Sequence, residues 1–199
     1  EQFKSLSATS ARLDPDVFES TEVGMKVALP NNMSLTAAYF DSEQVRAERD
    51  NDTGETSEVR GLTVDGFEIE LKGRVNDGLN LAIAYSDLSG ETSSGGIPRE
   101  IPEHTLSAFA AWEVNEKLSV ALGLTQQGES KIKDNTPGLV LPEYTRVDLS
   151  AYYQVAPNLS VQMNVENLMD ELYFPHSHST HQASVGESVN SRVSLRWTY

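Results

Sequence analysis

The stretch FEIELKGRV, residues 67–75, decides the fold class. Phe67, Ile69 and Leu71 occupy every second position, and charged residues stand between them. Successive side chains of a β-strand point to opposite faces, whereas a helix repeats every 3.6 residues. This stretch therefore predicts a strand with one apolar face and one charged face.

The same alternation recurs along the chain and predicts nine strands. They span 17–29, 33–46, 58–75, 79–89, 104–114, 118–127, 144–155, 159–168 and 188–199. No window has a convincing apolar stripe of helical period. The fold class is therefore all-β.

The connections between the predicted strands alternate between short and long. Four are tight and rich in turn-forming residues: PNN at 30–32, NDG at 76–78, NEK at 115–117 and APN at 156–158. Long polar segments lie between them. This order predicts an antiparallel up-and-down meander, with tight turns at one end and elaborate loops at the other.

Strand length and loop asymmetry favour a transmembrane barrel wall over a soluble sheet. Strands of soluble sheets commonly have about 5–6 residues, while a tilted membrane strand needs about 9–11. Outer-membrane barrels also sort short turns and long loops to opposite ends, and Greek-key sandwiches have no reason to do so. The chain lacks any run of roughly 20 apolar residues, which excludes only helical spans. A soluble β-rich binding module stays as an alternative.

Charge and composition limit the classes of partner and site that the chain can have. Fifteen Lys and Arg against thirty Asp and Glu give a formal charge of −15, which disfavours nucleic acid. The absence of cysteine excludes disulfides and cysteine-based metal sites. The first twenty residues have no basic-then-apolar signal segment. We expect either that a signal was removed or that the chain begins partway through a longer protein.

The final stretch SRVSLRWTY, 191–199, has the clearest alternation at a chain end. Its apolar set, ending in Trp197 and Tyr199, is expected to contact lipid, with these aromatics in the interfacial girdle. Ser194, Arg196 and Thr198 would then face a wet interior. An odd number of antiparallel strands cannot close on itself, and open edges in hydrocarbon cost several kcal/mol per unpaired group. Strands from the same polypeptide, another copy or another chain must complete the wall.

The segment YTRVDLSAYYQVAPNLSVQMNVENLMDELYF, 144–174, resembles the penultimate hairpin of TonB-dependent outer-membrane receptors. VGESVNSRVSLRWTY, 185–199, is similar to the approach to their final strand. Upstream, STEVGMKVAL, LTVDGFEIELKGRV and IPEHTLSAFAAW resemble further strands of the family in the expected order. The resemblance covers 17–199. The region after ENLMDELYFPHSH is most similar to the branch that imports catecholate-type ferric siderophores.

The resemblance implies a 22-stranded transmembrane β-barrel plugged by an N-terminal domain. Residues 1–199 would be the C-terminal portion of the barrel, with the plug domain and the first part of the barrel absent. It implies a receptor in the outer membrane of a Gram-negative cell that imports a ferric siderophore or similar metal chelate. The expected partners are that ligand, TonB through the absent plug, and membrane lipid. A passive porin-like or structural wall completed by oligomerisation is the alternative.

Candidate ligand-binding residues lie in the long connections. FPHSHSTHQ, 174–182, holds three of the four histidines: His176, His178 and His181. Imidazoles at this spacing suit a metal or an iron chelate, although a solvated loop that happens to be His-rich is the simpler explanation. Arg60 and Arg99 lie near loop ends, where they would meet an anionic siderophore complex. We predict no dedicated metal site and no cofactor.

The charged residues that alternate with the apolar ones along the predicted strands are expected to line the barrel interior. They are Glu68, Glu70, Lys72, Arg74, Arg146, Asp148, Arg192 and Arg196. Pairing with one another or with a plug would satisfy them. For an enzyme, His104 and Ser107 are the nearest candidates, but residues three apart on a strand face opposite sides. No G-x-S-x-G or H-E-x-x-H motif occurs either. We therefore predict a protein that is not an enzyme.

Overall fold

The computed structural model describes residues 17–49, 56–132 and 138–199, and the regular elements in these ranges are β-strands. Nine of them form one antiparallel sheet in the order β1-β2-β3-β4-β5-β6-β9-β10-β13. Their bounds are β1 (Val17–Leu29), β2 (Met33–Arg49), β3 (Thr56–Asn76), β4 (Leu79–Thr92), β5 (His104–Glu113), β6 (Leu118–Gln127), β9 (Tyr144–Ala156), β10 (Leu159–Glu166) and β13 (Asn190–Trp197). The predicted nine-strand meander is confirmed. Within the described ranges, no helix is long and apolar enough to cross a membrane.

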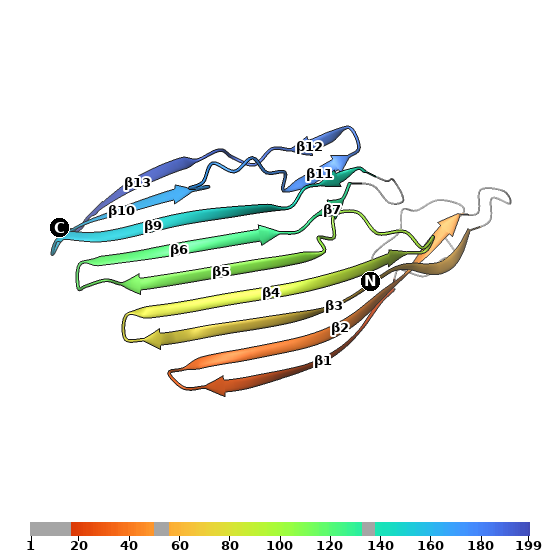
Figure 1. The fold of residues 1–199 in the computed structure, drawn as a ribbon, viewed down its shortest axis with the longest axis horizontal. Coiled ribbons are helices and arrows are strands. Elements are labelled where there is room, and N and C mark those ends of the chain that lie inside the picture. Colours follow the sequence, from red (N-terminus) through yellow and green to blue (C-terminus); the bar gives the residue numbers. More distant parts are fainter. Residues whose placement is uncertain (1–16, 50–55, 133–137) are drawn as a thin grey trace.

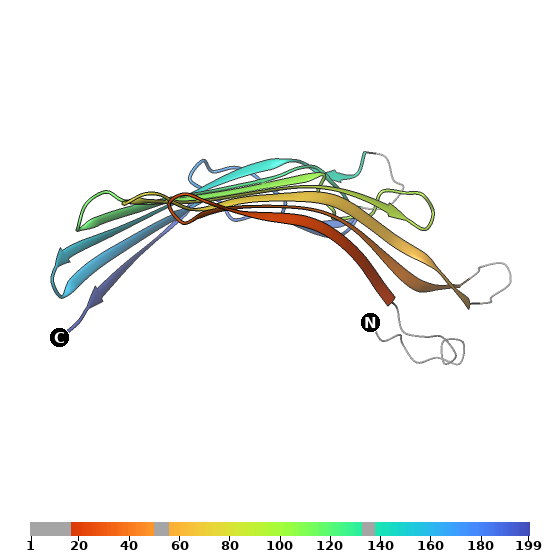
Figure 2. The same ribbon diagram turned by 90° about the horizontal axis from the view of Figure 1, so that it is seen from below.

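The strands follow one another across the sheet in chain order (Figure 1). The short turns and the C-terminus lie at one end, and the long connections lie at the other. Seen from below, the sheet is arched, with β1 and β13 at its two margins (Figure 2). Among the described residues, β1 pairs only with β2 and β13 only with β10. The sheet is thus an open, curved wall.

Two small hairpins lie within the long connections. β7 (Ser130–Lys131) pairs with β8 (Val140–Leu141), and β11 (His176–Ser179) pairs with β12 (Gln182–Ser184). The sequence analysis treated both segments as polar loops and missed them. Strands of two to four residues are too short to develop a recognisable alternation.

Some predicted strand ends were wrong. The last strand stops at Trp197, because its partner β10 begins at Leu159, the residue opposite Trp197. Only Thr198 continues the contact, with a 3.0 Å hydrogen bond from its N–H to the carbonyl of Asn158. At the other end of β10, the predicted strand to 168 stops at Glu166, because Asn167 has a positive φ of 52°.

The register gives the sheet two faces of different chemistry. On the apolar face, Val27 pairs with Leu35 and Leu35 pairs with Leu71. On the polar face, Thr36 pairs with Lys26 and Glu70. The apolar side chains are uncovered: Val23 is 74% exposed and Leu195 is 72% exposed. A soluble sandwich would bury such residues between two layers, whereas the described chain forms a single layer.

The buried hydrophobic residues lie at the end of the sheet that carries the long connections, which we call the loop end. In the described ranges the buried hydrophobic residues are Leu141, Tyr144, Val165 and Tyr173. Tyr144 begins β9, Leu141 ends β8, and Tyr173 belongs to the connection after β10. The most tightly packed part of the molecule is therefore where the long connections meet the sheet.

Candidate functional site

Three long connections, 93–103, 128–143 and 167–189, lie at one end of the sheet, and residues 133–137 of the second are outside the described part (Figure 1). The first two continue the ladder of the strands they leave. Leu88 N–H donates to the carbonyl of Glu103 at 2.9 Å, and Glu103 N–H donates to that of Glu129 at 3.1 Å. Further out, Glu100 N–H donates to the carbonyl of Lys131 at 2.8 Å. Backbone pairing thus joins the described parts of these two connections to each other and to the sheet.

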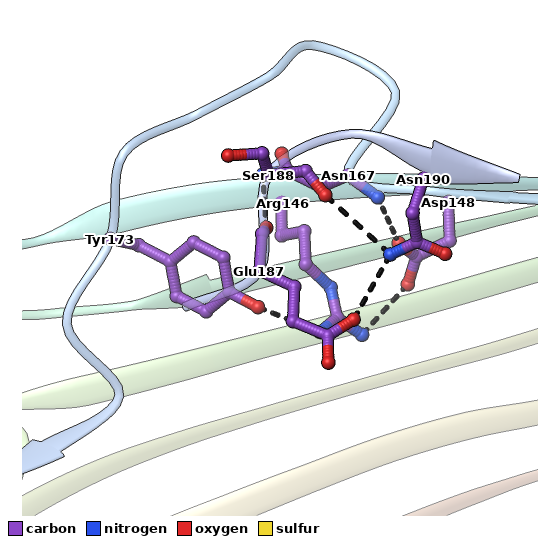
Figure 3. A network of polar contacts seen from close by, with 7 residues as sticks. All are labelled: Arg146, Asp148, Asn167, Tyr173, Glu187, Ser188 and Asn190. Atoms are coloured by element: carbon purple, nitrogen blue, oxygen red, sulfur yellow. Dashed lines mark hydrogen bonds and ion pairs between the residues drawn. The ribbon is translucent and has the colours of Figure 1, made fainter. Parts of the chain in front are cut away.

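The third connection is closed at its base by Asn167, which is 1% exposed. Its side-chain amide donates to the carbonyls of Glu171 and Glu187, each at 2.9 Å, and accepts from Glu171 N–H at 2.9 Å. Its own N–H donates to Asp148 Oδ1 at 2.9 Å. One buried residue therefore joins the two ends of the connection through its side chain and binds β9 through its backbone N–H (Figure 3).

Arg146 of β9 also binds the base of connection 167–189 to the sheet. Its guanidinium donates to Asp148 Oδ2 at 2.9 Å and to the Tyr173 hydroxyl at 3.2 Å (Figure 3). The Tyr173 ring packs on Tyr144 with 4.8 Å between centroids. A Cβ added at Gly186 would overlap that ring, so the close approach requires glycine. Arg146 and Asp148 belong to the set of charges expected to pair with one another or with a plug, and here they pair with each other.

Other charges of the polar face pair along the same strand. Lys72 Nζ lies 2.6 Å from Glu70 Oε1. Arg74 donates from Nε to the Asn76 carbonyl at 3.1 Å, at the tight turn after β3. A recess of about 400 Å³ opens on this face, lined by residues that include Glu68, Glu70 and Ser107. The expected internal pairing is thus present for Glu70 with Lys72.

The predicted histidines lie on the β11–β12 hairpin. His176 is exposed, faces Ser184 in the register, and has Nε2 within 2.8 Å of the Ser184 hydroxyl. His181 is exposed at the hairpin turn. The backbone of His178 belongs to β11, but its side chain lies outside the described part. No cluster of three metal-ligating side chains occurs among the residues that the structure describes.

The two predicted arginines lie in different places. Arg99 is exposed in connection 93–103, and its backbone forms an isolated parallel bridge with Lys131. Arg60 lies on β3, paired with Val45, and its side chain is outside the described part. The structure therefore places Arg99 in the loop assembly, by which we mean the described parts of connections 93–103, 128–143 and 167–189. The roles of Arg99 and Arg60 in binding stay predictions.

A contact that was not predicted links connection 93–103 to the histidine hairpin. Glu100, next to Arg99, accepts hydrogen bonds from the Ser177 N–H at 2.7 Å and from the Ser177 hydroxyl at 3.3 Å. Ser177 is only 5% exposed and follows His176. Because 77 residues separate the partners, no local sequence pattern could have signalled the contact.

The rejected catalytic pair is separated as expected. His104 stacks on Tyr85, with 6.3 Å between ring centroids. In the register Tyr85 pairs with Leu106 and Ala84 pairs with Ser107. His104 and Ser107, three residues apart on β5, therefore occupy positions of opposite faces.

Comparison with known proteins agrees with the fold. The sequence model of the family "TonB dependent receptor-like, beta-barrel" matches residues 2–168. The probable TonB-dependent siderophore receptor PiuA of Acinetobacter baumannii is 26% identical over 98% of the chain and 29% of its own length. The crystal structure of PiuA superposes with a TM-score of 0.85, at 25% identity, over 98% of this chain and 30% of that one.

Two receptors of Pseudomonas aeruginosa are similar as well. The metal-pseudopaline receptor CntO is 27% identical over 94% of the chain and 28% of its own length. The outer-membrane ferripyoverdine receptor bound to ferripyoverdine is 27% identical, with a TM-score of 0.80, over 93% of this chain and 27% of that one. The chain thus spans less than a third of these relatives. The matched strands and the family model agree, and the chain belongs to the TonB dependent receptor-like β-barrel family.

Proposed function

We propose that this chain forms part of the wall and the outer loops of an outer-membrane receptor that imports a ferric siderophore or a similar metal chelate. The energy would come from TonB, acting through a plug domain outside the chain. The main support is the loop assembly held over one end of a two-faced, single-layer sheet. A wall that only separates compartments has no need of such tied connections.

In this proposal residues 1–199 are the C-terminal portion of the barrel. The remaining wall strands and the plug lie elsewhere in the polypeptide. Two features support this arrangement: the sheet has an odd number of strands, nine, and its margins β1 and β13 do not pair with each other in the described structure. The apolar face would contact lipid of a Gram-negative outer membrane, and the polar face would line the interior.

The ligand is proposed to meet the loop end. His176, His178 and His181, together with Arg99 and Arg60, would supply imidazole and cationic groups to an anionic ferric complex. The relatives are named as receptors for siderophores or for the metal complexes of siderophore-like chelators, which favours import over passive diffusion. A catecholate chelator is the class we propose to test first.

The test is uptake of radioactive iron by cells that express the complete receptor and lack their own ferric-siderophore receptors. Ferric 2,3-dihydroxybenzoate and a ferric hydroxamate complex serve as probes. We expect saturable uptake that disappears when the tonB gene is deleted. Uptake that is unchanged by the deletion and does not saturate would instead support the porin-like alternative.

A further inference from the structure

Glu100 has an unusual backbone conformation. Five non-glycine residues of the described chain have positive φ, and four of them are Asn or Asp, which tolerate this region: Asn31, Asn32, Asn167 and Asp170. Glu100, at φ 56°, is the exception. A residue stays in such a conformation only where its surroundings fix it, and such residues gather at functional positions.

The contacts of Glu100 lie on two sides. Its N–H donates to the carbonyl of Lys131 at 2.8 Å, which ties connection 93–103 to connection 128–143. Its carboxylate accepts from both the N–H and the hydroxyl of Ser177, at 2.7 and 3.3 Å, which ties it to connection 167–189. One residue thus joins connections 93–103, 128–143 and 167–189 through contacts of their described residues.

The link to Ser177 has a direct consequence for His176. Ser177 is buried, and it follows His176 on the four-residue strand β11. Holding the N–H of Ser177 therefore holds the backbone from which the exposed His176 ring projects. The second strand of the hairpin fixes the ring itself, through the 2.8 Å contact between His176 Nε2 and Ser184 Oγ.

We propose that Glu100 is a positioning residue, which holds the β11–β12 hairpin and the His176 imidazole in place over the loop end before a ligand arrives. The importance of this for transport rests on the proposed function. A hydrogen bond to an ionised acceptor is stronger than one between neutral groups. A binding segment that is already ordered loses less conformational entropy when it binds.

The structural test needs no ligand. Glu100→Gly removes the carboxylate and favours the positive φ, so backbone strain cannot account for any effect. Glu100→Gln keeps a neutral acceptor. Glu129→Gln is the matched control, since Glu129 binds Lys131 Nζ in the same assembly at 2.9 Å and belongs to connection 128–143. Each variant is made in the complete receptor in detergent micelles.

Two readouts report on the hairpin. The first is hydrogen exchange of the Ser177 amide. The second is the distance distribution between spin labels at Ile97→Cys and Ala183→Cys, two exposed positions in a chain that has no native cysteine. We expect about tenfold or faster exchange and a broader distribution for Glu100→Gly, a smaller change for Glu100→Gln and no change for Glu129→Gln. An unchanged Glu100→Gly variant overturns the proposal.

The binding test uses whichever ferric probe the wild-type receptor takes up. We expect Glu100→Gly to weaken the affinity about tenfold, mainly by slowing association, with partial rescue in Glu100→Gln. A looser hairpin with unchanged affinity would overturn the positioning role. A wild-type receptor that takes up no ferric complex would overturn the proposed transport function, whereas the spin-label and exchange results would still decide whether Glu100 fixes the hairpin.

Discussion

The ring of Tyr173 occupies the space beside Gly186, and the Gly186 N–H donates a 2.8 Å hydrogen bond to the carbonyl of Tyr173. Tyr173 and Gly186 are thirteen residues apart, so the segments before β11 and after β12 meet at contact distance. The Tyr173 hydroxyl also accepts from Arg146 of β9. Connection 167–189 is therefore fastened to the sheet at its base, and the β11–β12 hairpin projects from a fixed platform.

Gly186→Ala tests this packing. The added Cβ would overlap the Tyr173 ring, so the ring or the backbone must move. Overpacking of this kind typically costs about 1–3 kcal/mol. We expect a loss of that size in the free energy of unfolding of the complete receptor, measured by urea titration. Gly123→Ala is the control, because a Cβ there would lie 3.8 Å from Asp148 Cβ, an ordinary contact. Equal effects of the two changes would contradict the packing argument.

Asn167 offers a second test, in which side chain and backbone are separated. Asn167→Gly keeps the positive φ but removes the side-chain donor to the carbonyls of Glu171 and Glu187, at an expected cost of about 1–3 kcal/mol. Asn167→Ala loses the same bonds and adds the strain of a left-handed alanine, about 1 kcal/mol more. Urea titration of both variants measures the difference. Identical stabilities would show that the backbone conformation contributes nothing.

The two faces of the sheet were predictable because alternation is a local signal. Leu35 and Leu71 each alternate with polar neighbours, and this alternation puts each of them on the apolar face of its strand. The tight turns then set the register that pairs them. The loop end was not predictable in this way. The contact between Glu100 and Ser177 depends on a positive φ and on the path of two connections, neither of which follows from residue spacing. Asn167 was part of a quoted motif, but its burial could not be read from the motif.

Arg146 and Tyr173 should act together. Arg146→Lys keeps the charge but loses the planar fork that reaches both Asp148 and Tyr173. Tyr173→Phe removes only the hydroxyl. We expect each variant to destabilise the base of connection 167–189, so that added protease cleaves the connection faster. The double variant should lose no more than about 0.5–1 kcal/mol of this local stability beyond the loss in Arg146→Lys alone. Strictly additive effects in this double-mutant cycle would mean that the 3.2 Å contact is energetically silent.

The assignment of the apolar face to lipid can be tested with two neighbouring residues of β10. Met163 is 43% exposed on the apolar face, between Ala151 and Val193, and the exposed Gln162 lies on the polar face. An arginine on the lipid side of a membrane barrel costs about 2–4 kcal/mol near the bilayer midplane, whereas the interior tolerates charge.

We therefore expect Met163→Arg to destabilise the folded receptor in lipid vesicles by about that amount, and Gln162→Arg to change its stability little. Because the two positions are adjacent on one strand, they differ in face and hardly in depth. If Gln162→Arg proved the costlier change in vesicles, the faces would have to be exchanged and the arched sheet would present its charged side to lipid.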